Sequence, residues 1–198
     1  MTQARVTRCL PALGALTALI MATRQDWLKR LDLRAVELAG SRRTPGAVTA
    51  ARTASAAAEP VVAAALLAAA TVTALGRRRD SAGWQAWLVP AGAVLTGAAA
   101  RHRLAQLVAR PRPPAALWLA KPTGSSLPSR HTCLAALTAG ACAQALGADR
   151  TASQGAALLA SAGVGAGRVC LGVHWPSDVV AGWLFAAAWL DLATGGVA

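Results

Sequence analysis

The chain has 198 residues, 55% of them hydrophobic, and its 20 basic against 8 acidic residues leave a formal net charge of +12. This length allows one domain with a substantial core, but not two. The apolar excess is unlike an average soluble domain and favours an integral membrane protein. The basic excess favours anionic partners such as phosphate groups or acidic lipid headgroups. Nucleic acid is disfavoured, because the basic residues lie in short segments between apolar runs without interleaved aromatics.

Residues 1–59 are predicted to form a short apolar helix followed by an amphipathic segment. The apolar run from Leu10 to Ala22 is shorter than the roughly 20 residues that a spanning helix needs. A signal peptide has a similar core, but no small-x-small cleavage site follows, so we expect a retained helix. From Asp26 to Leu38 apolar residues recur at helical spacing. This predicts an amphipathic helix that lies either on a membrane surface or on its own domain.

Residues 60–198 are predicted to form the helical core of this single domain, after a polar connector over Ser41–Pro60. Apolar runs predict helices over Pro60–Gly76, Trp84–Ala100, Thr132–Gly147, Thr151–Gly167 and Val179–Ala193. No strand-like alternation is present, and the four cysteines have no C-x-x-C spacing that would indicate a zinc site or a redox pair. The fold class is therefore all-α, an integral-membrane bundle of about five to six helices with an N-terminal amphipathic segment.

A long loop from Arg101 to His131, rich in proline, glycine and serine, is the first candidate site segment, since loops this long are usually functional. Two spans separate it from the second segment, Arg168–Asp178, so both should emerge on the same side. Guanidinium forks match phosphate oxygens bidentately. The predicted phosphate-binding residues are Arg103, Arg110, Ser129, Arg130 and Arg168.

Ser129 in this set is predicted to be the N-cap that directs the free backbone amides of the following helix at the same anion. Arg101 and Arg112 are interpreted instead as topology signals.

The two histidines in these segments permit a division of roles. Asp178, four residues after His174, can orient one ring nitrogen so that the other attacks phosphorus, and His131 remains as the acid for the departing oxygen. The eight acidic residues are scattered, which argues against a two-metal site, and we expect no metal or other cofactor. A serine hydrolase built on Ser129 would need a G-x-S-x-G elbow, which the sequence lacks.

Three motifs in order resemble the type 2 phosphatidic acid phosphatase superfamily, which includes membrane lipid phosphatases, bacterial acid phosphatases and vanadium haloperoxidases. Its patterns K-x6-R-P, P-S-G-H and S-R-x5-H-x3-D are matched by Arg103, Arg110 and Pro111, by Pro128, Ser129, Arg130 and His131, and by Gly167, Arg168, His174 and Asp178. The chain departs from these patterns at Arg103 for lysine, at Arg130 for glycine and at Gly167 for serine. We expect the last two departures to affect substrate preference and rate more than reaction type.

The resemblance implies metal-independent dephosphorylation through a phosphohistidine on His174, in a six-helix membrane architecture. The substrate would be a polyprenyl phosphate or diphosphate, or a glycerolipid phosphate, in a bacterial cell membrane. The side of the membrane is open, because the basic residues place the site in the cytoplasm and the resemblance to bacterial lipid phosphatases places it outside. Alternatives are a haloperoxidase-like or soluble-type acid phosphatase, and a catalytically silent membrane scaffold that binds lipid headgroups.

Overall fold

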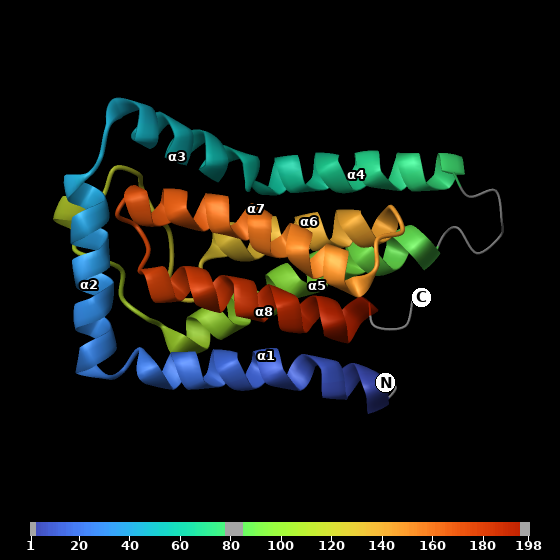
Figure 1. Cartoon of the computed structure of the whole chain (residues 1–198), viewed down its shortest axis with the longest axis horizontal. Coiled ribbons are helices and arrows are strands. Elements are labelled where there is room, and N and C mark those ends of the chain that lie inside the picture. The colour runs from blue at the N-terminus through green and yellow to red at the C-terminus, as the bar shows by residue number, and fades with distance from the viewer. Residues whose placement is uncertain (1–2, 78–84, 195–198) are drawn as a thin grey trace.

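The computed structural model describes residues 3–77 and 85–194, and all regular secondary structure in this part of the chain is helical (Figure 1). The helices are α1 Gln3–Ala22, α2 Asp26–Ser41, α3 Pro45–Ala57, α4 Pro60–Arg77, α5 Gln85–Val108, α6 Arg130–Ala145, α7 Arg150–Cys170 and α8 Pro176–Thr194, with a 3-10 turn at Ala115–Leu117. The all-α class is confirmed. The predicted count of five to six is too low, since eight α-helices lie in the described residues.

Most of the helices run along one common direction, and α6 lies at the centre of the bundle (Figure 1). It packs against α4, α5, α7 and α8. Its residues Ala136, Leu137 and Ala141 are completely buried, as is Leu190 of α8. At one end α2 lies across the bundle, after a bend of 91° from α1. The same end holds the α5–α6 loop, the start of α6 and the α7–α8 turn (Figure 1). The prediction that the two candidate segments emerge on the same side is therefore confirmed.

The predicted connector Ser41–Pro60 is mostly the helix α3. Thr44 caps it by accepting a hydrogen bond from Ala47 N at 3.1 Å, and Pro45 supplies the preset backbone angle of a first helical position. The alanines that follow have the highest helix propensity of any residue. Only Ala58 and Glu59 separate α3 from α4, and the two helix axes bend by 60° there.

Helix α5 continues beyond the predicted start of the long loop at Arg101 and ends at Val108. Its last two turns contain alanine, leucine, glutamine and arginine, which are good helix formers. The helix then stops at Ala109, which has a positive φ of 47°, and before the pair Arg110–Pro111, since a residue ahead of proline avoids helical geometry. Of the predicted run that precedes this loop, Trp84 lies outside the described residues.

Helix α2 forms as predicted and packs on its own domain through one face. Leu28, Asp32 and Val36, spaced four residues apart, are its buried residues. Trp27 and Leu31 are each 57% exposed. The apolar residues on which the amphipathic prediction rested are therefore divided between a face toward the bundle and a face away from it.

Two glycines allow the helices around the site to approach closely. A Cβ at Gly165 would lie 2.2 Å from a methyl carbon of Val179, and one at Gly182 would lie 3.1 Å from the carbonyl of Ser129. Larger residues would push α8 away from α7 and from the start of α6. These contacts set how near the polar groups on the three helices come to one another.

Within the described residues, no single helix meets both the length and the hydropathy of a membrane span, whereas two bent pairs do so jointly, 6–22 with 26–41 and 45–57 with 60–76.

Candidate active site

His174 lies in the turn between α7 and α8 and is 1% exposed. Its Nδ1 is 3.3 Å from Asp178 Oδ2, and its Nε2 is 3.1 Å from a terminal nitrogen of the Arg112 guanidinium. A guanidinium has donors only, so it donates to Nε2. The ring proton therefore belongs on Nδ1, toward Asp178, and Nε2 carries the lone pair.

Burial lowers the pKa of His174 to about 4, although the hydrogen bond with Asp178 opposes that shift. The imidazole is therefore neutral around pH 7. A neutral imidazole whose second nitrogen is held by a carboxylate is the form that a nucleophile requires. The structure thus brings His174 and Asp178 together in the predicted geometry, and their catalytic roles remain a prediction.

Asp178 is completely buried and holds the start of α8 as well as His174. Its Oδ2 accepts hydrogen bonds from Trp175 N at 2.9 Å and from the Ser126 hydroxyl, and its Oδ1 accepts from Arg110 at 2.7 Å. Trp175 is the residue before the first turn of α8, so the bond to its N–H is the acidic half of a capping box. One carboxylate therefore fixes both the helix start and the orientation of the imidazole.

Arg110 is engaged by carboxylates, which differs from the phosphate contact predicted for it. Its guanidinium donates to Asp178 and to the Ser177 hydroxyl, both at 2.7 Å, and to Asp32 at 2.7 Å. Asp32 comes from α2 and is 2% exposed. A guanidinium between two buried carboxylates is already neutralised. Arg110 therefore holds the carboxylate of Asp178 in place. The sequence analysis missed Asp32 because it lies in an amphipathic helix far from the motifs in sequence.

Arg112, interpreted from the sequence as a topology signal, lies at His174 instead. Its N–H groups donate to the backbone carbonyls of four residues, Thr123 at 2.8 Å, Gly124 at 3.0 Å, Ser125 at 3.2 Å and Val173 at 2.7 Å. One further N–H reaches His174 Nε2. The sequence held a signal for this residue, because Arg–Pro occurs twice in succession over residues 110–113. The motif spacing selects the first pair, and the fold places the second at the histidine.

Helix α5 directs Arg101 inward and Arg103 outward. Arg101 is 8% exposed and donates to the carbonyl of Pro128 at 2.8 Å, whereas Arg103 is exposed. Residues two apart on a helix lie about 200° apart around its axis. The extension of α5 past Arg101 therefore turns Arg103 away from the buried polar groups. Arg101, interpreted from the sequence as a topology signal, instead holds the loop before α6 through its hydrogen bond to Pro128.

The start of α6 contributes Ser129, Arg130 and His131. Ser129 is the N-cap residue as predicted, but its hydroxyl makes no capping bond and accepts a hydrogen bond from Thr132 at 3.0 Å. It is completely buried, so it shapes the turn rather than lining an open site. The first N–H groups of a helix have no intrahelical partners, and they favour an anion at this position.

His131 has a carboxylate partner that the sequence analysis missed. Its Nε2 is 3.0 Å from Oε1 of Glu59, and Arg130 is 3.4 Å from the same oxygen. Glu59 occupies the break between α3 and α4 and is 42% exposed. It is 72 residues from His131, and no motif contains it. Only the packing of the α3–α4 bend against the start of α6 brings the two together.

Arg168 is 5% exposed and donates to the Ser55 hydroxyl of α3 at 3.3 Å. Its Nε is buried without a hydrogen-bond partner in the described part of the chain. A buried guanidinium with unfilled donor capacity suits an oxyanion. The neighbouring Gly167 allows α3, which carries Ser55, to come this close, since a Cβ at Gly167 would lie 3.2 Å from backbone atoms of Ala51 in the same helix. The departure from serine at Gly167 thus lets α3 pack on α7.

These groups form one polar cluster at the end of the bundle. It combines a neutral imidazole nitrogen, three arginines, a helix N-terminus and a second histidine with its own acid. Among residues 3–77 and 85–194, no group of three or more histidines, cysteines and acids is placed to hold a metal ion. Guanidinium groups and helix amides can bind a phosphoryl group and stabilise the charge that develops as it is transferred. The arrangement is therefore suited to phosphoryl transfer to an imidazole nitrogen.

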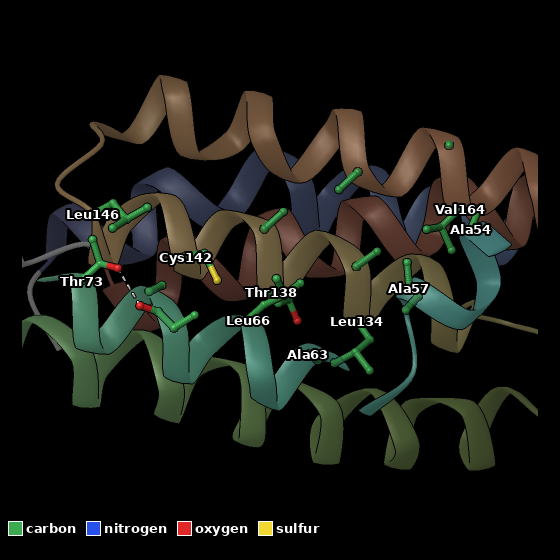
Figure 2. A pocket seen from close by; sticks show the side chains of 17 residues that line it. Ala54, Ala57, Ala63, Leu66, Thr73, Leu134, Thr138, Cys142, Leu146 and Val164 are labelled. Atoms are coloured by element: carbon green, nitrogen blue, oxygen red, sulfur yellow. Dashed lines mark hydrogen bonds between the residues drawn. The ribbon is translucent and has the colours of Figure 1, made fainter. Parts of the chain in front are cut away.

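An apolar cavity of about 670 Å³ lies beside this cluster, between α3, α4, α6 and α7 (Figure 2). Leu134 lies on its wall, one turn after His131, and Ala57 lies on its wall just before Glu59. Figure 2 shows Thr73 and Leu146 at the opposite end. Most of the lining side chains are alanines. The cavity therefore extends from the polar cluster along the bundle.

The comparisons with known proteins agree with the motifs. The family model of the PAP2 superfamily matches residues 86–196. The structure is similar to the crystal structure of a transmembrane PAP2-type phosphatidylglycerolphosphate phosphatase from Bacillus subtilis, with a TM-score of 0.79 and 19% sequence identity over 95% of this chain and 94% of that one. No curated protein matches the sequence.

Asp32, Ser55 and Glu59 lie outside the segment that the family model matches, so the polar cluster joins the family motifs to residues from α2, α3 and the α3–α4 break. The phosphatase class predicted from the motifs is confirmed. Since the matched segment covers more than half of its residues, the chain belongs to the PAP2 superfamily.

Proposed function

We propose that the chain is a membrane-embedded lipid phosphatase that transfers the phosphoryl group of its substrate to His174 and then to water. The observation that carries this proposal is the state of His174. It is neutral, its proton faces Asp178, and its Nε2 lone pair accepts a hydrogen bond from Arg112, an N–H that would turn to the phosphoryl oxygen when substrate binds. An imidazole in this state can attack phosphorus without first losing a proton.

The reaction proceeds in two steps. In the first, a bond forms between His174 Nε2 and phosphorus while the bond from phosphorus to the lipid oxygen breaks, and His131 gives that oxygen a proton. In the second, water loses a proton to His131 and attacks phosphorus, the phosphorus–nitrogen bond breaks, and phosphate leaves. Arg168 and Arg112 offset the charge on the equatorial oxygens in both steps, so the proposed mechanism is metal-independent.

The cavity in Figure 2 supports a lipid substrate over a water-soluble one. Its lining is almost entirely apolar, and it begins within one helical turn of His131. From Leu134 to Leu146 the wall follows α6 for about 18 Å. A hydrocarbon chain would bury its surface there while its phosphate lay in the polar cluster. A polyprenyl phosphate or diphosphate and a glycerolipid phosphate both have this form.

Helix α2 supports a membrane location. It lies across the bundle axis, and it exposes Trp27, Leu31 and Leu38 on the side that does not pack on the core. Tryptophan and leucine on a helix that also carries basic residues are typical of the membrane interface. The polar cluster would then lie near the level of the lipid headgroups.

The test is phosphate release by the purified protein in detergent with a chelator present, measured on a panel of polyprenyl and glycerolipid phosphates. We expect activity on long-chain substrates that is insensitive to the chelator and absent in His174→Ala. An absolute requirement for divalent metal would overturn the proposed mechanism. Binding of these lipids without any hydrolysis would favour a headgroup-binding scaffold instead.

A second measurement tests the cavity. Ala135→Phe should fill part of it, whereas Ala115→Phe in the α5–α6 loop changes a residue outside it. We expect the first variant to lower kcat/KM for long-chain substrates by about tenfold, the cost of excluding one or two methylenes, and to spare short-chain ones. Equal losses on both chain lengths would argue against the cavity as the chain-binding site.

A further inference from the structure

Glu59 is the acid that the structure places beside His131, outside every motif of the family. The Nε2 of His131 is 3.0 Å from Glu59 Oε1, while its Nδ1 is buried and has no hydrogen-bond partner in the described residues. His131 is itself 7% exposed. Since Nδ1 faces the protein interior, Nε2 is the nitrogen that can exchange a proton with a substrate.

Glu59 lies closer to Nε2 of His131, at 3.0 Å, than the donor-only Arg130 does, at 3.4 Å, so the contact with Glu59 determines where the proton of His131 lies. If Nε2 were the unprotonated nitrogen, its lone pair would face a carboxylate oxygen at hydrogen-bonding distance, which is repulsive. An N–H at this position donates to the carboxylate instead. Glu59 therefore favours a proton on Nε2, the nitrogen that serves the reaction, and its negative charge favours the second proton that the ring must carry to act as an acid.

The positive charges around His131 disfavour its protonated form, so a nearby carboxylate is needed to offset them. Arg130 is 3.4 Å from the ring nitrogen, and the charge of Arg168 also acts on the ring. The burial of the ring, Arg168 and Arg130 all oppose a positive charge on His131, whereas Glu59 favours one. Glu59 is the acid that faces the ring among the described residues, and it also pairs with Arg130. The cation introduced where the family pattern has glycine is thus matched by an anion from the α3–α4 break.

We propose that Glu59 is a positioning residue that stabilises the imidazolium form of His131 and holds its Nε2–H for the departing oxygen, an inference that rests on the proposed phosphatase function. Glu59 is 42% exposed and lies between two helices, so the carboxylate can withdraw when the substrate reaches the ring. The imidazolium of His131 gives its Nε2 proton to the lipid oxygen as the phosphorus–oxygen bond breaks, and the ring becomes neutral. A proton returns to His131 from water in the second step, and Glu59 stays a carboxylate throughout.

The experiment compares Glu59→Gln with the wild type on two probes, a long-chain alkyl phosphate and 4-nitrophenyl phosphate. An alkoxide must be protonated as it leaves, whereas 4-nitrophenolate leaves without a proton. We expect Glu59→Gln to lower kcat/KM for the alkyl phosphate by roughly 10- to 100-fold, within the range of general acid catalysis, and to change that for the aryl phosphate by less than about threefold. Glu59→Asp should recover part of the loss.

A pH profile gives a second readout. Without the carboxylate, the alkaline limb of the alkyl phosphate profile should move to lower pH, because Arg130 and Arg168 then act on His131 unopposed. Glu37→Gln changes an exposed acid on α2 and should leave both probes and the limb unchanged. Aryl phosphatase activity in Glu59→Gln also reports that the variant is folded.

The outcomes separate this inference from the proposed function. A wild-type protein that hydrolyses neither probe would overturn the proposed function. A wild-type protein active on both, with Glu59→Gln losing equal activity on both or none on either, would overturn the role of Glu59 alone.

Discussion

The two histidines of the site are held in different ways. His174 is 1% exposed, and its carboxylate partner is four residues away and completely buried. His131 is held by an acid 72 residues away that is 42% exposed. His174, the proposed nucleophile, thus lies in a fully buried hydrogen-bond network. His131, the proposed proton carrier, contacts a partly exposed side chain that has room to move. Precise placement matters most for the nucleophile, whereas the proton carrier must release and regain its partner in each cycle.

The largest expected effect would come from removing each histidine in turn. His174→Ala should lower turnover by at least about 10⁴-fold for every substrate, as loss of a nucleophile does in other enzymes, and no phosphorylated protein should be trapped by acid quench. His131→Ala should still be phosphorylated by 4-nitrophenyl phosphate, because that leaving group needs no proton. A trapped phosphoenzyme in His174→Ala would assign the nucleophile to another residue.

Replacement of the arginine at His174 ranks second. Arg112→Ala should reduce kcat/KM by about 10²- to 10³-fold, the usual cost of one transition-state donor. Arg103→Ala, which alters an exposed residue of α5, is the matched control and should stay within about twofold of the wild type. A larger loss in Arg103→Ala than in Arg112→Ala would instead support the phosphate-binding role that the sequence motif predicts for Arg103.

Loss of Asp32, the acid that pairs with Arg110, should affect stability more than catalysis. Asp32→Asn leaves the buried Arg110 paired with Asp178 alone, and Ser177 loses a charged acceptor. We expect the unfolding free energy to fall by about 2 kcal/mol, as for a hydrogen bond to a charged group. Thermal unfolding in detergent measures it, with the exposed Glu37→Gln on the same helix as control. An unchanged Tm would show that the network does not depend on α2.

The last prediction concerns the pH dependence of stability. The pKa of His174 falls from 6.5 to about 4 on folding because of burial. Between these values the unfolded chain binds more protons, so stability should be full above pH 6.5 and be lost as the pH falls toward 4. His174→Gln cannot take up this proton, and its Tm should decline less over the same interval. Parallel declines in the two proteins would show that other groups dominate acid unfolding.

The helical class and the ordered site segments were predictable from sequence because both depend on local spacing. The pair His174 and Asp178 is four residues apart, which one turn of backbone brings together regardless of the rest of the fold. Arg168 and His131 were likewise predicted from motifs that lie at helix ends. The even number of spans between the two segments was enough to place them at one end of the bundle.

Tertiary structure alone decided which arginine meets the nucleophile and which acids join the site. The motif spacing selects Arg110 over Arg112 in the repeated Arg–Pro pair, whereas the structure places Arg112 at His174, because of where α5 ends and because α2 supplies an acid to Arg110. Ser55 reaches Arg168 because Gly167 lets α3 pack on α7, and Glu59 reaches His131 because the α3–α4 break packs against the start of α6. Such contacts depend on how helices distant in sequence approach one another, which is set by the summed packing of many small side chains and not by the spacing within any one segment.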